Sequence, residues 1–282
     1  MELLYLTAII LGCAGQNIVK KPFADRFGGK GVYFFNALTG FAALLFFVCT
    51  VRQPRWDMAV IPYAIGFAAA YSLSAIFSIR AVACGPLTIS SLVISYSLLV
   101  PTLYGIIFLR DPIKISLFPG IALLMVSLFL VNMPEKNAKI SWKWICYMLL
   151  AFIGNGMCSV IQNMEQVAFD GAYKNEFMIL ALAMMTGVMV ILTLTTEYRQ
   201  LKPCIRNGWY QPLICGVLNG LVNLLVMVLS ARMPVSIMFP SISAGGQVAT
   251  YLASRYFYRE KLTKLQFIGF VLGILSVIIL NI

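Results

Sequence analysis

The chain has 282 residues, of which 61% are hydrophobic and 11% are charged. Soluble domains carry about a quarter charged residues, so this composition excludes a water-soluble enzyme and indicates a surface that faces hydrocarbon. The formal net charge of +11 fits basic loops on one side of a membrane and does not call for a nucleic acid as partner.

Ten apolar segments follow one another along the chain, each near the roughly 20 residues that a helix needs to cross about 30 Å of hydrocarbon. They are residues 3–19, 32–51, 58–78, 86–109, 115–131, 142–161, 177–195, 212–230, 234–257 and 265–280. The first has no cationic leader and no cleavage site, so we expect a membrane span there and not a signal peptide. The polar loops between the segments are short. The sequence therefore predicts an all-α, polytopic membrane protein with ten transmembrane helices.

The second half of the chain repeats the first with an offset of 148 residues, which one insertion changes to 149. The matches that count involve residues other than Leu, Ile and Val: Pro86 and Pro234, Ser95 and Ser243, Arg110-Asp111 and Arg259-Glu260, Gly120 and Gly269, Ser127 and Ser276. Five helices per half is an odd number, so the second copy must enter the membrane inverted. We expect one repeat at 1–133, a linker at 134–141 and a second repeat at 142–282, with the substrate site where the repeats meet.

Polar side chains recur on single helix faces. The predicted span 234–257 shows this best, with Ser236, Pro240, Ser243, Gln247, Thr250 and Ser254 at intervals of three and four residues. A polar group exposed to lipid costs several kcal/mol, so such a face indicates an aqueous cavity or a partner helix. The residues expected to line a substrate cavity are Gln16, Asn17, Tyr71, Ser74, Ser95, Thr102, Asn155, Ser159, Gln162, Asn219, Asn223, Ser243, Gln247 and Thr250.

Two alternatives remain open for these residues. Hydroxyl groups can bond the backbone carbonyl one turn back on their own helix, and amides can hold neighbouring helices together. Pro101 and Pro240 each remove a backbone donor, which frees a carbonyl group one turn earlier for a cavity or produces an ordinary kink. The Gly216-x-x-x-Gly220 motif favours tight helix packing inside one chain over a dimer face, and the protein is expected to be a monomer or a homodimer.

The composition does not predict a catalytic site or a metal site. The chain has no His, and its seven cysteines form no CxxC pair, so no catalytic residue, metal ligand or cofactor is predicted. No charged residue lies securely in the middle of a predicted span. Lys20 and Glu165 fall near span ends, where long side chains can reach headgroups. Proton-driven transporters usually keep a buried ionisable group, which leaves a facilitator, an exchanger or coupling through Glu165.

These residues resemble the drug/metabolite transporter superfamily, specifically its ten-helix EamA branch. The resemblance is carried by the first helix (residues 11–20, ending in Lys20) and by the repeated block of a helix-opening proline, a basic–acidic pair and a following glycine. It implies a central cavity built by helices one to four and six to nine. Two departures stand out: Asp111 replaces the usual Glu, and Gly12 and Cys13 occupy the region where small multidrug transporters carry a carboxylate.

The orientation of the termini is open, because the loops after odd-numbered helices carry most of the Lys and Arg residues. The positive-inside rule then places both termini outside, whereas the resemblance implies that both are cytoplasmic.

The sequence favours a secondary transporter of the cell membrane, an exporter or exchanger that moves a small polar metabolite such as an amino acid, nucleobase or amine by alternating access. Its partners would be that small molecule and membrane lipid. A flippase for a lipid-linked carrier is an alternative that would use cations such as Arg80 and Arg255, and a sugar or nucleotide-sugar permease is another. An intramembrane enzyme or a receptor lacks any nucleophile–base or metal constellation.

Overall fold

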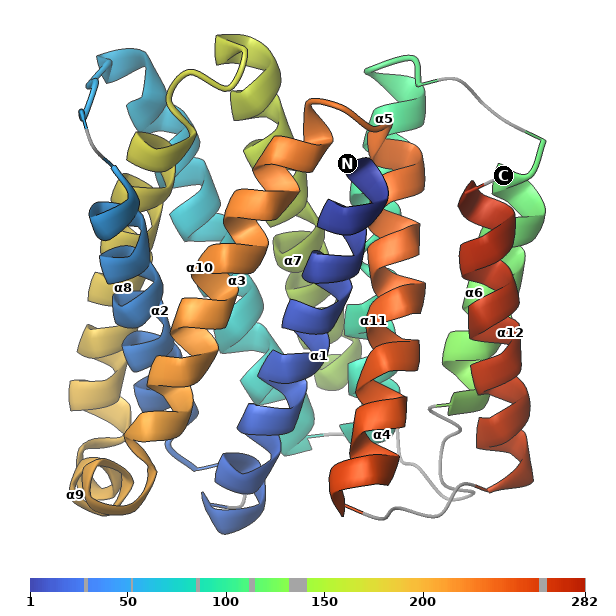
Figure 1. Cartoon of the computed structure of the whole chain (residues 1–282). Helices are drawn as coiled ribbons and strands as arrows, with labels where there is room; N and C mark the ends of the chain where they lie inside the picture. Colours follow the sequence, from blue (N-terminus) through green and yellow to red (C-terminus); the bar gives the residue numbers. More distant parts are fainter. Residues whose placement is uncertain are drawn as a thin grey trace. The chain divides into compact units, whose positions relative to one another are not determined.

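A computed structural model of the chain describes residues 1–27, 30–51, 53–84, 87–111, 115–131, 141–258 and 263–281. No β-strand occurs within these ranges, and helices follow one another throughout (Figure 1). They are α1 (Glu2–Phe27), α2 (Val32–Thr50), α3 (Ile61–Cys84), α4 (Leu87–Tyr96), α5 (Leu99–Ile107), α6 (Leu117–Val131), α7 (Trp142–Phe169), α8 (Lys174–Thr196), α9 (Tyr198–Gly208), α10 (Tyr210–Ser230), α11 (Val235–Tyr258) and α12 (Lys264–Asn281). The prediction of an all-helical chain is confirmed.

Several of these helices have the length and composition of membrane spans. Within the described residues, six qualify: Glu2–Phe27, Val32–Thr50, Met58–Ala81, Trp142–Phe169, Lys174–Thr196 and Tyr210–Ser230. Shorter apolar helices occur at Val93–Ile107, Leu117–Leu130 and Lys264–Leu280. Many large apolar side chains on these helices are exposed, as expected for surfaces that face lipid. The chain is therefore a multi-pass membrane protein.

Several predicted boundaries are wrong. Helix α1 continues to Phe27, past the end predicted at residue 19. The span predicted at 86–109 is two helices, α4 and α5, separated at Ser97-Leu98. Helix α7 continues to Phe169, past the end predicted at residue 161. The loop predicted at 197–211 contains a helix, α9. Pro86, Arg259, Glu260 and residues 134–140 of the predicted linker lie outside the described residues, as do the side chains of Ser254 and Arg255.

The described chain forms two compact units. Unit 1 comprises Leu3–Ser72 and Ile161–Ala231, and unit 2 comprises Leu73–Val160 and Arg232–Ile282. Each unit thus takes one stretch from each half of the sequence, and α3 and α7 contribute to both. A repeated sequence need not fold as a separate body, because a five-helix segment in a membrane buries its small and polar faces against other helices.

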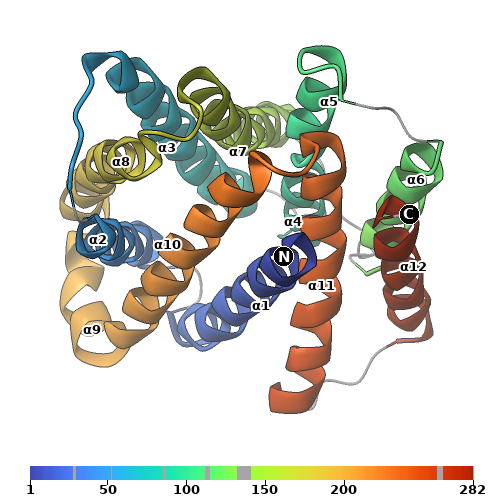
Figure 2. The same ribbon diagram turned by 45° about the horizontal axis from the view of Figure 1, so that its top comes forward.

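In unit 1, α2 packs between α8 and α10 (Figure 2). The prediction that glycines permit close packing is confirmed, because a Cβ atom at Gly216 would lie 2.4 Å from the carbonyl oxygen of Thr39. The start of α2 is held by the carboxylate of Glu197. It accepts hydrogen bonds from the backbone N–H groups of Val32, Tyr33 and Phe34 at 2.9, 3.0 and 3.1 Å. Negative charge at a helix N-terminus is stabilising there.

In unit 2, α6 and α12 lie side by side and run antiparallel (Figure 2). Two reciprocal hydrogen bonds join them: the Ser127 hydroxyl donates to the Gly269 carbonyl at 2.6 Å, and the Ser276 hydroxyl donates to the Gly120 carbonyl at 2.8 Å. The 149-residue offset of the predicted repeat relates both the two serines and the two glycines. Each bond is therefore the image of the other under that offset.

The break between α4 and α5 has a local cause. Pro101 has no backbone N–H, so it cannot bond the Ser97 carbonyl one turn earlier. That carbonyl accepts from the N–H of Val100 at 3.0 Å, and a Cβ atom at Gly156 would lie 2.9 Å from it. The Ser97 carbonyl is thus bonded to Val100 and packed against α7 inside unit 2. Pro240, by contrast, lies within the continuous helix α11.

Candidate functional site

Four of the predicted site residues form a chain of hydrogen-bonded side-chain amides in unit 1, which we call the amide ladder: Gln16 of α1, Asn219 and Asn223 of α10, and Gln162 of α7. Asn219 Nδ2 donates to Gln16 Oε1 at 3.4 Å, and Asn223 Nδ2 donates to Asn219 Oδ1 at 3.0 Å. Gln162 Nε2 donates to Asn223 Oδ1 at 3.3 Å. The ladder therefore links three helices through their side-chain amides.

Small residues of α1 bring the ladder together. A Cβ atom at Gly12 would lie 2.5 Å from Val222 Cγ2, and one at Gly15 would lie 3.3 Å from Leu218 Cδ1. Side chains at these positions would push α1 away from α10 and separate Gln16 from Asn219. The i, i+4 spacing of Asn219 and Asn223 then places both amides on the same face of α10. The Gly-rich start of the chain is thus needed for the geometry of the site.

The ladder has hydrogen-bonding capacity to spare. Each carboxamide offers two N–H donors and an oxygen with two lone pairs. Asn223 Nδ2 also donates to the Asn219 carbonyl at 2.9 Å, and Gln162 Nε2 also donates to the Asn223 carbonyl at 3.4 Å, so the donors of these two amides are used within the ladder. Gln162 is 5% exposed, whereas Gln16, Asn219 and Asn223 are half-buried and accessible in part. Such an array can donate to and accept from a small polar solute at several points. None of its four carboxamides carries a formal charge.

The end of α7 contains buried polar side chains that the sequence placed near a span end. Glu165 is fully buried and not extended toward headgroups, which corrects that expectation. One of its carboxylate oxygens accepts from Gln166, and the other has no partner among the described residues. Asn163 is 2% exposed, and neither polar atom of its side chain has a partner in the described chain. Gln166 continues the i, i+4 row of Gln162, a signal visible in the sequence.

Lys20 lies one turn beyond Gln16 on α1. Its ammonium group is 5.9 Å from the centre of the Phe35 ring, within the range of a cation–π contact. The side chain is exposed. A cation therefore stands beside the uncharged ladder within unit 1.

In unit 2, two predicted site residues make local structural bonds. Asn155 Nδ2 donates to the Ser97 hydroxyl at 2.6 Å, at the break between α4 and α5. The Thr102 hydroxyl is buried and donates to the Leu98 carbonyl at 2.8 Å, one turn back on the same chain. Both arrangements correspond to the structural alternatives that the sequence left open.

Ser95 of α4 and Ser243 of α11, which the predicted repeat matches, line one small cavity together with Pro240. Its volume of about 10 Å³ is near the smallest that holds a single water molecule. Gln247, one turn further along α11, is half-buried, and its Oε1 has no partner among the described residues. The polar face of α11 therefore combines a water-sized cavity with a spare acceptor.

The structure also places the remaining predicted residues. In unit 1, Asn17 is exposed beside Gln16, and Tyr71 stacks on Phe67 with ring centres 6.4 Å apart. In unit 2, Ser74, Ser159 and Thr250 are half-buried. Gln211 of α10 was not predicted, although it is 2% exposed and its amide has no partner in the described chain. No cluster of three or more Cys, Asp or Glu residues that could hold a metal occurs in the parts of the chain that the structure describes.

Comparisons with known proteins agree with this architecture. The profile of the EamA-like transporter family matches residues 142–282. No curated protein matches the chain. Among solved structures, 28 chains match; one is a crystal structure that is 12% identical, has a TM-score of 0.76, and is aligned over 99% of this chain and 95% of the other. At that identity the likeness concerns the fold alone.

Proposed function

Because the chain belongs to the EamA-like transporter family, we propose that it is a secondary transporter that exports or exchanges a small polar metabolite, such as an amino acid, nucleobase or amine. The amide ladder of Gln16, Asn219, Asn223 and Gln162 carries this proposal. Its unused donors and acceptors suit the polar groups of such a solute, and it lacks the fixed charge that would hold an ion tightly. We place the protein in the cell membrane.

We propose that transport proceeds by alternating access between two inverted five-helix repeats, 1–133 and 142–282, within ten membrane spans. The reciprocal bonds of Ser127 with Gly269 and of Ser276 with Gly120 support this repeat, because the same 149-residue offset relates both the two donors and the two acceptors. The antiparallel course of α6 and α12 is what an axis in the membrane plane requires. In this scheme the ladder of unit 1 binds the substrate, and the polar faces of the fourth and ninth predicted spans remain predicted cavity linings.

A screen of ligands against the purified full-length protein tests the substrate class. A molecule that binds only the folded form raises its apparent melting temperature, by an amount that grows with the ratio of concentration to Kd. We expect stabilisation by one of the amino acids, nucleobases or amines. Stabilisation only by sugars or nucleotide sugars would establish the permease alternative, and stabilisation only by a lipid-linked carrier would establish a flippase.

Ion coupling can be tested at Glu165, the buried carboxyl group with an unbonded oxygen. If protons drive transport through this group, Glu165→Gln abolishes uptake driven by a pH gradient in liposomes. Substrate counterflow, which needs no gradient, continues. Asp57→Asn is a control, because the carboxylate of Asp57 is exposed and accepts the backbone N–H of Ala59 at 2.9 Å. Uptake that does not respond to the pH gradient in wild type would instead establish a facilitator or an exchanger, and gradient-driven uptake that persists in Glu165→Gln would exclude coupling through Glu165.

A further inference from the structure

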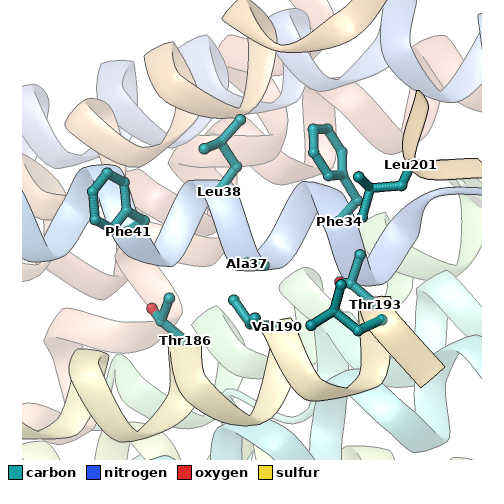
Figure 3. A pocket seen from close by; sticks show the side chains of 9 residues that line it. Phe34, Ala37, Leu38, Phe41, Thr186, Val190, Thr193 and Leu201 are labelled. Atoms are coloured by element: carbon teal, nitrogen blue, oxygen red, sulfur yellow. The ribbon is translucent and has the colours of Figure 1, made fainter. Parts of the chain in front are cut away.

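An apolar groove runs along the surface of unit 1 between α2 and α8 (Figure 3). Its volume is about 210 Å³, and its lining residues are Phe34, Ala37, Leu38, Phe41, Thr186, Val190, Thr193, Leu194 and Leu201. Phe41, Val190 and Leu194 are each more than 40% exposed, so the groove is open along its length. It has the shape and chemistry of a slot for a hydrocarbon chain.

The groove reaches about as deep as one leaflet of a bilayer. On α8 its lining extends from Thr186 to Leu194, which at 1.5 Å per residue is about 12 Å. The hydrocarbon of one leaflet is about 15 Å thick, half of a core of about 30 Å. Figure 3 shows Thr186 and Phe41 at one end of the groove and Leu201 of α9 at the other. The α9 end therefore corresponds to the membrane surface.

Helix α9 has the character of a helix that lies in the membrane interface. It runs across the ends of α8 and α10, and Figure 1 shows it almost along its axis. Cys204 and Gly208 are buried on one face, whereas Arg199, Lys202 and Arg206 are exposed on the other. Tyr198, Trp209 and Tyr210 flank α9 and are exposed, as aromatic residues at the headgroup level are.

We propose that the groove and α9 together bind one anionic phospholipid. An acyl chain lies along α2 and α8, and the phosphate headgroup sits over α9, where it meets Lys202, Arg199 and Arg206. Their flexible side chains can reach a phosphate at the surface while the apolar face of α9 stays packed. Charge complementarity selects the anionic headgroup, because each Lys or Arg near the surface of a membrane adds about fivefold to binding of anionic lipid. This lipid is a bound component of unit 1 and is distinct from the substrate of the amide ladder.

Native mass spectrometry of the full-length protein in detergent tests this site with phosphatidylglycerol and phosphatidylcholine of equal chain length. We expect wild type to retain phosphatidylglycerol at least tenfold better. The variant R199Q/K202Q/R206Q should lose this preference, whereas Lys143→Gln, an exposed lysine on α7, should keep it. Equal retention of the two lipids by wild type, or an unchanged preference in the triple variant, would overturn the proposal.

A second pair of variants tests the groove itself. Val190→Phe fills the groove from α8 and should reduce retention of both lipids at least fivefold. Ile191→Phe adds the same ring at the neighbouring position, which is 62% exposed and does not line the groove, and should have no effect. Equal retention by the two variants would show that the acyl chain does not lie there. Free glycerol phosphate should not bind, because the headgroup alone lacks the apolar contact; binding of it equal to that of the lipid would also contradict the proposal.

Discussion

The two compact units use their polar side chains differently. In unit 1, carboxamides bond to carboxamides across α1, α10 and α7. In unit 2, hydroxyl groups such as those of Ser127 and Ser276 bond to backbone carbonyls of a neighbouring helix. A hydroxyl has one donor and is satisfied by one carbonyl, whereas an amide has more groups than a neighbour can satisfy. The comparison indicates that the hydroxyl groups of the α6–α12 contact serve packing, whereas the amides of the ladder keep some acceptors and donors for a further partner.

The largest expected effect on stability comes from the contact between α2 and α10. Gly216→Ala places a methyl group 2.4 Å from the Thr39 carbonyl, so α10 must shift away from α2 at a cost of about 1–3 kcal/mol. Gly187→Ala on α8 is the matched control, because nothing lies within 4 Å of a Cβ atom there. Thermal unfolding in detergent measures both. Equal melting temperatures would contradict the tight contact between α2 and α10.

A second contrast separates packing from binding inside unit 2. Asn155→Leu removes the bond to Ser97 at the helix break, so we expect a loss of about 1 kcal/mol in stability. Gln247→Leu replaces an amide whose Oε1 has no partner in the described chain, so stability should be unchanged or increased. Substrate flux should nevertheless fall in Gln247→Leu if its face lines the path. Normal flux in that variant would remove α11 from the path.

The reciprocal bonds between α6 and α12 predict a smaller and symmetric effect. Ser127→Ala and Ser276→Ala each remove one hydroxyl-to-carbonyl bond, and such bonds in membranes average about 0.6 kcal/mol. We expect the two variants to lower the melting temperature by similar amounts and to transport normally. A loss confined to one serine would contradict the equivalence of the two bonds.

The smallest change concerns α9 and needs only a labelling measurement. Burial raises the pKa of the Cys204 thiol, and the nearby Glu197 carboxylate raises it further. Less thiolate at neutral pH means slower reaction with a maleimide. In a variant that retains only Cys204, we expect labelling at least tenfold slower than at Ile205→Cys in a cysteine-free background, since Ile205 is 48% exposed. Equal labelling rates at the two cysteines would mean that Cys204 is as accessible as an exposed residue, which would contradict the burial of its side chain on one face of α9.

Apolar runs predicted most of the fold, since the predicted spans fall on the observed helices with few exceptions. The break at Ser97 follows from Pro101, but the sequence alone did not show whether that proline would kink the helix or divide it. Pro240 shows the other outcome, because α11 continues through it. Helix α9 was not predicted because its charged and polar composition is typical of a loop. The half-buried Leu201 and the buried Cys204 and Gly208 recur at helical spacing, a period that could have identified the helix.

The candidate site was predictable in composition more than in arrangement. The residues of the ladder all belong to the predicted set, because amides in apolar spans are costly to leave exposed. The pairing of the amides depends on the close approach of α1 and α10 at Gly12. Helix periodicity does not predict this tertiary contact. The same limit applies to Glu165, whose burial depends on the continuation of α7 to Phe169.

The most direct test is substrate counterflow in liposomes for Asn223→Leu and Asn36→Leu. Asn223 joins two links of the ladder, whereas Asn36 on α2 donates to the Val32 carbonyl of its own helix at 2.9 Å. With equal amounts of folded protein, we predict at least a tenfold loss of counterflow in Asn223→Leu and little change in Asn36→Leu. Should Asn223→Leu fail to fold, Gln16→Leu at the half-buried end of the ladder replaces it. Full counterflow in a folded ladder variant would contradict the assignment of the amide ladder as the substrate site.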